Sequence, residues 1–146
     1  MFFLRPIPSA LGQILQTQMD VNGCTNTFNE IHYLEHVQCK LSLRFFPRGN
    51  LRILLTSPMG TTSVLLFERP RDVTSSNFED WPFLSVHFWG ERPQGRWTLQ
   101  IINGGNRQVN QPGTNKTKGL DLILEKILFV DFKKKIKLHF LLMQVF

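Results

Sequence analysis

The chain has 146 residues, of which 42% are hydrophobic and 19% charged, a composition typical of one globular domain and not of a disordered chain. Its formal net charge of +6 favours an acidic partner, but four lysines lie together in FKKKIKL, residues 132–138, and without them only +2 remains. We therefore expect no nucleic-acid partner, and no transmembrane segment either, because no apolar run reaches the roughly 18–20 residues that cross a bilayer.

The N-terminal segment MFFLRPIPSALGQIL does not have the form of a secretory signal. Such a signal places a basic residue before about 7–15 apolar residues, whereas here Arg5 comes after the first apolar residues and two prolines follow it. We expect no signal peptide in this chain. If the protein enters the secretory pathway, we expect a further segment before Met1.

Short β-prone runs alternate with turn signals from about Ile31 to Ile102. The pattern is clearest in HVQCKLSLRF, where Val37, Cys39, Leu41 and Leu43 recur at the period of two that a half-buried strand requires. The expected strands are residues 36–45, 51–57, 63–67, 84–89 and 96–102, with turns at PRGN and SPMGT between the first three. Strands at this spacing with no helix between them predict an all-β fold, a jelly-roll-like antiparallel β-sandwich.

The segment after the polar loop 103–115 can be interpreted in two ways. In LDLILEKILFVDF, residues 120–132, Leu120, Leu122 and Leu124 alternate as in a strand. A helical face is equally consistent with the pattern, through Leu120, Ile123, Leu124, Ile127 and Leu128. Periodicity leaves the secondary structure of this C-terminal tail open.

The stretch NEIHYLEHVQ, residues 29–38, contains HxxEH from His32 to His36, a sequence motif found in zinc proteases. A zinc site needs this motif on a helix, because only there do residues four apart reach one metal. Here the motif leads into a strand pattern, and residues four apart on a strand are about 13 Å apart. We therefore expect no metal site, and a strand entrance at which Tyr33, Leu34 and Val37 supply apolar contacts.

Other candidates for chemistry are also better explained as structural. A serine hydrolase of the GxSxG type is not indicated, and His87 lies between apolar residues in an expected strand. Glu79 and Asp80 are adjacent, so a strand would point them to opposite faces, although a calcium site in a loop remains an alternative. We predict neither catalytic nor metal-binding residues, and we expect the lysines of residues 133–137 to be solvated.

Five blocks in order resemble the P domain, also called the Homo B domain, of furin- and kexin-like proprotein convertases. The blocks are NEIHYLEHVQCKLSL, RGNLRILLTSPMGT, RPRD, NFEDWPFLSVHFWGE and PQGRWTLQI, and the resemblance covers residues 13–113. It implies a jelly-roll sandwich that performs no chemistry, packs on a subtilisin-like serine protease domain and stabilises it. The parent enzymes resembled here depend on calcium, expected in their catalytic domain and not in this chain, and cleave precursors at dibasic sites in the secretory pathway.

The resemblance divides the chain into an N-terminal extension (1–12), the P domain (13–125) and a divergent basic and apolar tail (126–146). Structural or interdomain roles are expected for Tyr33, Leu34, His36, Arg48, Trp81, Phe83, His87, Trp89 and Trp97. Some of the tryptophans should fill the core and others face the protease domain. Asn115, in Asn-Lys-Thr, is a formal glycosylation acceptor.

This sequence departs from the family pattern at two places that matter here. Arg48-Gly49-Asn50 stands where the family commonly has Arg-Gly-Asp. Cys24 matches a family cysteine whose partner lies upstream, which leaves a Cys24–Cys39 disulfide as the substitute pairing or two free thiols.

The alternative to a P domain is an independent jelly-roll module that binds carbohydrate or an acidic surface, because a fold alone does not determine function.

Overall fold

The computed structural model describes residues 4–5, 11–28, 30–73, 77–105, 122–131 and 136–139. Within these ranges the chain forms strands and one short 3-10 helix, η1, and no α-helix. The elements are β1 (Leu4–Arg5), β2 (Ile14–Val21), β3 (His36–Leu43), η1 (Arg48–Asn50), β4 (Leu51–Thr56), β5 (Thr62–Leu66), β6 (Phe78–Ser85), β7 (Gly95–Asn103), β8 (Leu122–Asp131) and β9 (Ile136–His139).

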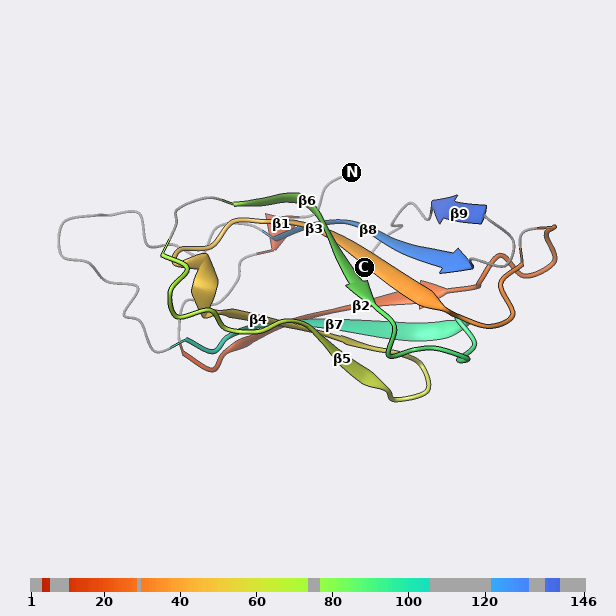
Figure 1. The fold of residues 1–146 in the computed structure, drawn as a ribbon, viewed down its shortest axis with the longest axis horizontal. Helices are drawn as coiled ribbons and strands as arrows, with labels where there is room; N and C mark the ends of the chain where they lie inside the picture. The colour runs from red at the N-terminus through yellow and green to blue at the C-terminus, as the bar shows by residue number, and fades with distance from the viewer. Residues whose placement is uncertain are drawn as a thin grey trace.

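The strands form two antiparallel sheets that lie face to face (Figure 1). One sheet has the order β1-β8-β3-β6, with β9 also paired to β8, and the other has the order β2-β7-β4-β5. The chain therefore folds as one long hairpin with β4 and β5 at its tip. Counted from the tip, its successive antiparallel pairs are β4–β5, β3–β6, β2–β7 and β1–β8. These pairs belong alternately to the two sheets. This wrapping is a jelly roll, so the predicted fold class is confirmed.

The core lies between the sheets and follows the period-two pattern of the sequence. On β3 the buried residues are Val37, Cys39, Leu41 and Leu43, as predicted. Leu51, Ile53 and Leu55 of β4, and Trp97, Leu99 and Ile101 of β7, are buried from the opposite sheet. The two inner faces thus supply one continuous apolar layer.

β2 was not predicted from the sequence. Its residues ILQTQMDV carry only a weak alternation, since Thr17 occupies an inward position that is usually apolar and is buried there. β2 nevertheless pairs with β7 without interruption from Ile14 to Val21.

The predicted strand at residues 84–89 was misplaced, because β6 runs from Phe78 to Ser85 and is followed by a turn in which Trp89 N donates to Val86 O at 3.2 Å. Two features of β6 make this strand hard to recognise from the sequence. Pro82 cannot donate to a neighbouring strand, which an edge strand tolerates. Asp80 has φ 45° beside a register shift against β3, so the polar and apolar residues of β6 do not alternate regularly.

The sequence left open whether residues 120–132 form a strand or a helix, and the structure describes residues 122–131 of this segment. Residues 122–131 form a strand, β8, that pairs with β3 from His36 to Leu43. β8 runs across residue 125, where the sequence placed the end of the domain, and β9 extends the same sheet.

Candidate interaction surface

Three loops meet at one end of the sandwich, on the right in Figure 1. They are the β2–β3 loop (residues 22–35), the β4–β5 turn (57–61) and the β6–β7 loop (86–94), and we call them together the loop end. Leu34 connects two of them, because its N–H donates to Glu91 O at 2.8 Å and its carbonyl accepts from Gly90 N at 2.7 Å. The Thr61 hydroxyl donates to the Glu91 carboxylate and so joins the third loop. The loop end is therefore an interconnected unit.

The HYLEH stretch belongs to this unit and is not a helix. Leu34 is fully buried, whereas Tyr33 is exposed and has the Arg92 guanidinium 6.0 Å from its ring centroid. His36 begins β3, and its ring lies edge-on to Trp89 with centroids 5.6 Å apart. His32 is exposed and lies 3.8 Å from a Glu30 oxygen. The two histidines have different neighbours, and the described residues contain no group of three metal-ligating side chains.

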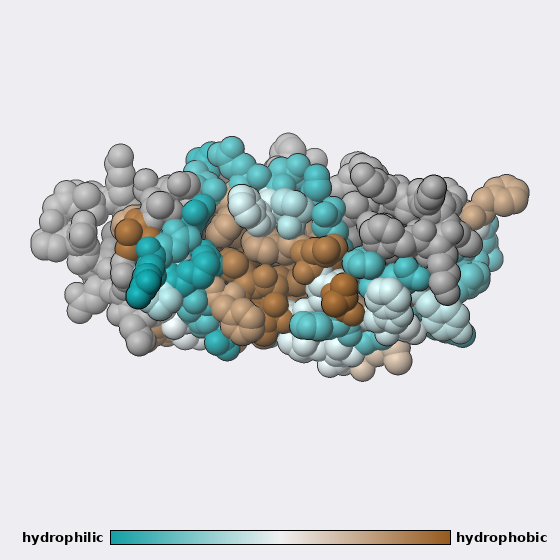
Figure 2. Space-filling view, viewed as in Figure 1, coloured by the Kyte–Doolittle hydropathy of each residue, from teal (hydrophilic) through white to brown (hydrophobic). Residues whose placement is uncertain are grey.

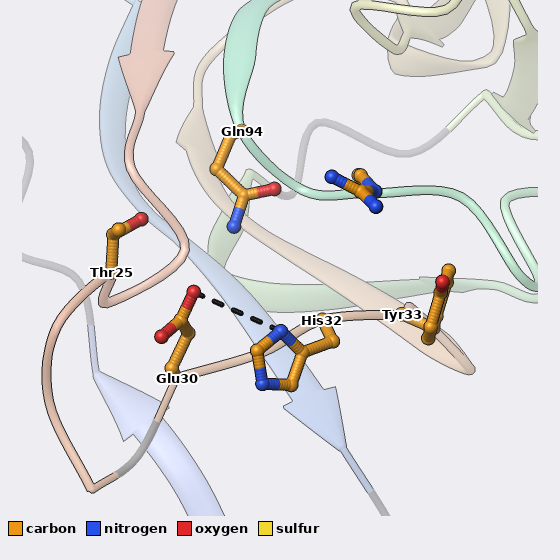
Figure 3. Close-up of a pocket in the computed structure, with 6 residues that line it drawn as sticks. Thr25, Glu30, His32, Tyr33 and Gln94 are labelled. Carbon is orange, nitrogen blue, oxygen red and sulfur yellow. Dashed lines mark ion pairs between the residues drawn. The ribbon is translucent and has the colours of Figure 1, made fainter.

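An open pocket of about 540 Å³ lies beside this stretch, lined by Thr25, Glu30, His32, Tyr33, Arg92 and Gln94. Figure 3 shows the Glu30 carboxylate turned toward the His32 ring, with Gln94 reaching in from the β6–β7 loop. Gln94 Nε2 donates to Ile31 O at 3.3 Å, so this amide also holds the two loops together. The pocket carries charges of both signs and the rings of His32 and Tyr33, which suits contact with a polar partner surface.

The three tryptophans divide between core and surface. Trp97 is 1% exposed and packs in the core, whereas Trp81 is 49% and Trp89 61% exposed. Between them along the chain, Leu84 is 60% and Val86 48% exposed. We call Trp81, Leu84, Val86 and Trp89 the β6 apolar run. These four exposed apolar side chains follow one another along an edge strand and the turn after it. Trp81 pairs with the buried Leu41 and Leu84 with Gln38, so the two leave the strand on opposite sides.

The face of the molecule that carries β5 and β6 shows apolar surface gathered between the two layers (Figure 2). β5 and β6 are the edge strands of the two sheets there. Polar side chains border the apolar area above and below in the same view. An apolar centre with a polar border is the usual anatomy of a protein–protein contact.

His87 lies beside a pair of buried serines that connect the two sheets. Ser63 Oγ of β5 lies 2.7 Å from Ser85 Oγ of β6 and 2.8 Å from Nδ1 of His87. A serine beside a histidine resembles a nucleophile with its base. Ser63 is buried, however, so its hydroxyl is out of reach of a substrate, and this contact is a structural connection between the sheets.

Arg48 belongs to a compact ionic cluster at the other end of the sandwich. Its Nε lies 2.9 Å from Asp72 Oδ2, and Arg69 Nη2 lies 3.0 Å from the same oxygen. Both guanidinium groups also lie over the Phe78 ring, at 5.1 and 5.7 Å from its centroid. This cluster fastens the RPRD block onto the 3-10 turn, where Asn50 is buried, so Arg-Gly-Asn is not a surface motif. Arg48 is thus a structural residue.

The remaining predicted residues are placed as follows. Phe83 is buried and lies edge-on to Phe78. Asp80, the residue considered for calcium, pairs with Lys40 Nζ at 3.1 Å. Asn115 and Lys133, Lys134 and Lys135 lie outside the described residues.

The sequence left open a Cys24–Cys39 disulfide or two free thiols, and in the structure both cysteines are free. Cys39 points into the core from β3, whereas Cys24 lies in the turn after β2, at the loop end. Burial raises the pKa of the Cys39 thiol to about 12 and raises that of Cys24 to a smaller degree.

Several residues of this architecture were missed from the sequence. Asp72, Glu91 and Arg92 were not singled out, although each joins segments that are distant in the chain. Asp72 had a detectable signal, since it closes the RPRD block, but its partners could not be deduced from spacing alone. On the surface of β2 and β7, Arg96 lowers the pKa of Asp20 by a side-chain hydrogen bond.

Comparisons with known proteins bear on the role of this architecture. Residues 34–122 match the family model of the proprotein convertase P-domain. The chain is 75% identical over 109 residues to "Furin-like protease 2" of Drosophila melanogaster, an alignment that covers 75% of this chain and 6% of that protein. It is 46% identical to "Furin-1" of Xenopus laevis and 42% identical to "Furin" of Homo sapiens, each over 107 residues, covering 73% of this chain and 13% of either relative.

Among solved structures, a serine protease of Aeromonas sobria in complex with its chaperone is similar, with a TM-score of 0.43 and 23% identity. That alignment covers 88% of this chain and 24% of the protease chain. The chain thus spans 6% to 13% of the length of the curated relatives named above. No helix of the described residues is long and apolar enough to cross a membrane.

Proposed function

Because this chain belongs to the proprotein convertase P-domain family, we propose that it is the non-catalytic companion domain of a furin/kexin-like serine endoprotease. In this role it packs on the subtilisin-like catalytic domain and stabilises it. The observation that carries the proposal is the family match over residues 34–122, in a chain that covers only 6% to 13% of relatives named as proteases or furins.

The β6 apolar run is the part of the surface that we assign to this contact. Burying the exposed half of a tryptophan removes about 100 Å² from water, which is worth about 2–3 kcal/mol. Trp81 and Trp89 are two such side chains on a domain whose core is already filled. A neighbour that binds only the folded protease stabilises it by its binding free energy. Because protein domains are marginally stable, a few kcal/mol decide what fraction of the protease is folded.

The chemistry of the parent enzyme is assigned to the catalytic domain. Cleavage of precursors at dibasic sites, the catalytic triad and the bound calcium all belong there in this proposal. The location is the secretory pathway, which is supported by the furin and convertase names of the relatives.

Expression of the catalytic domain with and without this chain fused behind it, followed by assay of a dibasic peptide, tests the proposal. We expect secreted, active protease only from the fusion. The isolated chain should give a β-rich circular dichroism spectrum and no cleavage. Equal secretion and activity of the catalytic domain alone would contradict the stabilising role, and cleavage by the isolated chain would contradict its non-catalytic nature.

A further inference from the structure

Two Asn-Gly pairs occur in the described residues, Asn22-Gly23 and Asn103-Gly104. An asparagine followed by glycine is the pair most open to self-modification. Glycine has no side chain to shield its amide nitrogen, which can attack the asparagine side chain. Whether that attack occurs in a folded protein depends on the exposure and geometry of each pair.

Asn22 is exposed in the turn after β2. Its side-chain Oδ1 accepts a hydrogen bond from Cys24 N at 3.0 Å, which folds the side chain back over the Gly23 peptide unit. The same hydrogen bond draws electrons from the side-chain carbonyl and makes Cγ more electrophilic. Gly23 has φ 62°, a conformation that suits glycine in a tight turn. Asn22 is therefore exposed, held beside the Gly23 peptide unit and followed by a residue whose nitrogen no side chain shields.

Asn103 is also followed by glycine, but it is buried, whereas Asn22 is exposed. Asn103 lies at the end of β7, its N–H donates to Gln13 O at 3.3 Å and its carbonyl accepts from Gly12 N at 2.7 Å. Gly104 N, the nitrogen that would have to attack, donates to Asn50 O at 2.9 Å. Reaction at this pair requires local opening of the structure first.

We propose that Asn22 is a site of spontaneous deamidation, through a cyclic imide with Gly23. The Gly23 nitrogen loses its proton and bonds to Cγ of Asn22, the bond from Cγ to Nδ2 breaks, and the side-chain nitrogen leaves as ammonia. One water molecule then opens the imide at either carbonyl, which gives aspartate or isoaspartate. No enzyme, oxidant or further reactant is needed, and the rate rises with pH because the attacking nitrogen must be deprotonated.

The modification alters the loop end. Aspartate at position 22 adds a negative charge two residues from Asp20. Isoaspartate adds a carbon to the main chain directly before Gly23, whose carbonyl accepts from Ile31 N at 2.9 Å. Gly23 is also tightly surrounded, since a Cβ there would lie 2.7 Å from Pro93 Cγ. The product therefore loosens the attachment of the β2–β3 loop to the β6–β7 loop. This inference does not depend on the proposed function.

Peptide mapping by mass spectrometry of the full chain, aged at neutral pH, tests the proposal. Asn26 is a matched control, because it is exposed in the same loop but is followed by Thr27. We expect deamidation of Asn22 at least about tenfold faster than of Asn26 or Asn103, a difference of about 1.4 kcal/mol in the barrier. Aged N22Q protein should show no product at position 22, since glutamine would need a slower six-membered ring.

The products at position 22 and the relative rates at the three asparagines show whether the imide route operates. Isoaspartate together with aspartate at position 22 supports the imide route, and aspartate alone contradicts it. Equal rates at Asn22 and Asn26 would overturn the proposal. A rate at Asn103 equal to that at Asn22, in protein shown by circular dichroism to be folded, would also overturn it, because burial would then have no effect. Hydrogen exchange in residues 22–35 should increase in the aged protein and not in aged N22Q.

Discussion

The rings of Phe88 and Trp97 meet edge to face in the core, with their centroids 5.0 Å apart. The Trp97 indole N–H donates to Pro93 O at 2.8 Å, so a polar group is satisfied inside the apolar layer. Phe88 follows β6 and Trp97 lies in β7, so this contact holds the β6–β7 loop against the body of the sandwich. The buried Phe88 therefore fixes the position of the next residue, the exposed Trp89.

Replacement of Trp97 tests this contact. We expect W97A to lower the free energy of unfolding by about 3–5 kcal/mol, because it leaves a large cavity. W97F should cost less, since it keeps most of the ring but leaves Pro93 O without its donor, at about 1–3 kcal/mol. Urea unfolding followed by circular dichroism measures both. W89F is the matched control, and we expect it to lie within about 0.5 kcal/mol of the parent chain. An equal loss for W97F and W89F would contradict the assignment.

The Arg48–Asp72 cluster should stabilise the isolated domain. Asp72 is largely buried and accepts from two guanidinium groups, so D72N should cost about 1–3 kcal/mol in unfolding free energy. A double-mutant cycle with R48M should show clear non-additivity, because the two residues share one contact. D20N, which removes an equally short contact between Asp20 and Arg96 on the exposed surface, should have no resolvable effect. Equal effects of D72N and D20N would contradict the structural role of the cluster.

The two cysteines should differ in reactivity. The thiolate is the reactive form, and a pKa of about 12 leaves Cys39 with roughly a thousandfold less thiolate than an ordinary thiol near pKa 9. Cys39 is also shielded by the core, whereas Cys24 is partly exposed. We expect alkylation of native protein to modify Cys24 first, and Cys39 only in denaturant. Rapid labelling of Cys39 in native protein, or absence of two free thiols in denatured protein, would be inconsistent with the structure.

Cys39 also makes stability depend on pH in the alkaline range. Its folded pKa of about 12 lies above the unfolded value of about 9, so folding favours the protonated thiol. This contribution is fully present below about pH 9 and is lost as the pH rises toward 12, because the unfolded state then gains by releasing the proton. Urea unfolding at several alkaline pH values should show this decline, and C39A should flatten it. An identical slope in C39A would refute the assignment.

The sequence alone predicted the family and the fold class, and both are confirmed. The strong signal came from residues that alternate regularly, such as Val37 to Leu43, because burial on one face forces that pattern. β2 and β6 were missed or misplaced for the opposite reason. Thr17 occupies an inward position in β2, and in β6 the bulge at Asp80 and the proline at position 82 break the alternation.

Surface roles were harder to predict than the core. The sequence named all three tryptophans but could not separate the buried Trp97 from the exposed Trp81 and Trp89, because all three lie in or beside similar β-prone runs. It likewise named Arg48 without its partner Asp72, 24 residues away in the chain. Such pairs depend on how distant segments meet, which local patterns do not encode.

In the proposed role, this domain stabilises a protease through the β6 apolar run. The most direct measurement is the yield of secreted, active protease when the catalytic domain is fused to this chain carrying W81A and W89A together. V73A is the matched control, since Val73 is exposed in the β5–β6 connection at the opposite end of the sandwich. Urea unfolding of each isolated variant domain shows separately whether the domain itself has lost stability.

We expect at least a tenfold loss of active protease for the double variant, because two lost contacts of about 2–3 kcal/mol each lower the ratio of folded to unfolded protease by much more than tenfold. V73A should leave the yield unchanged, and the isolated double variant should remain folded. A double variant that supports as much active protease as the unaltered chain would show that the β6 apolar run does not stabilise the protease.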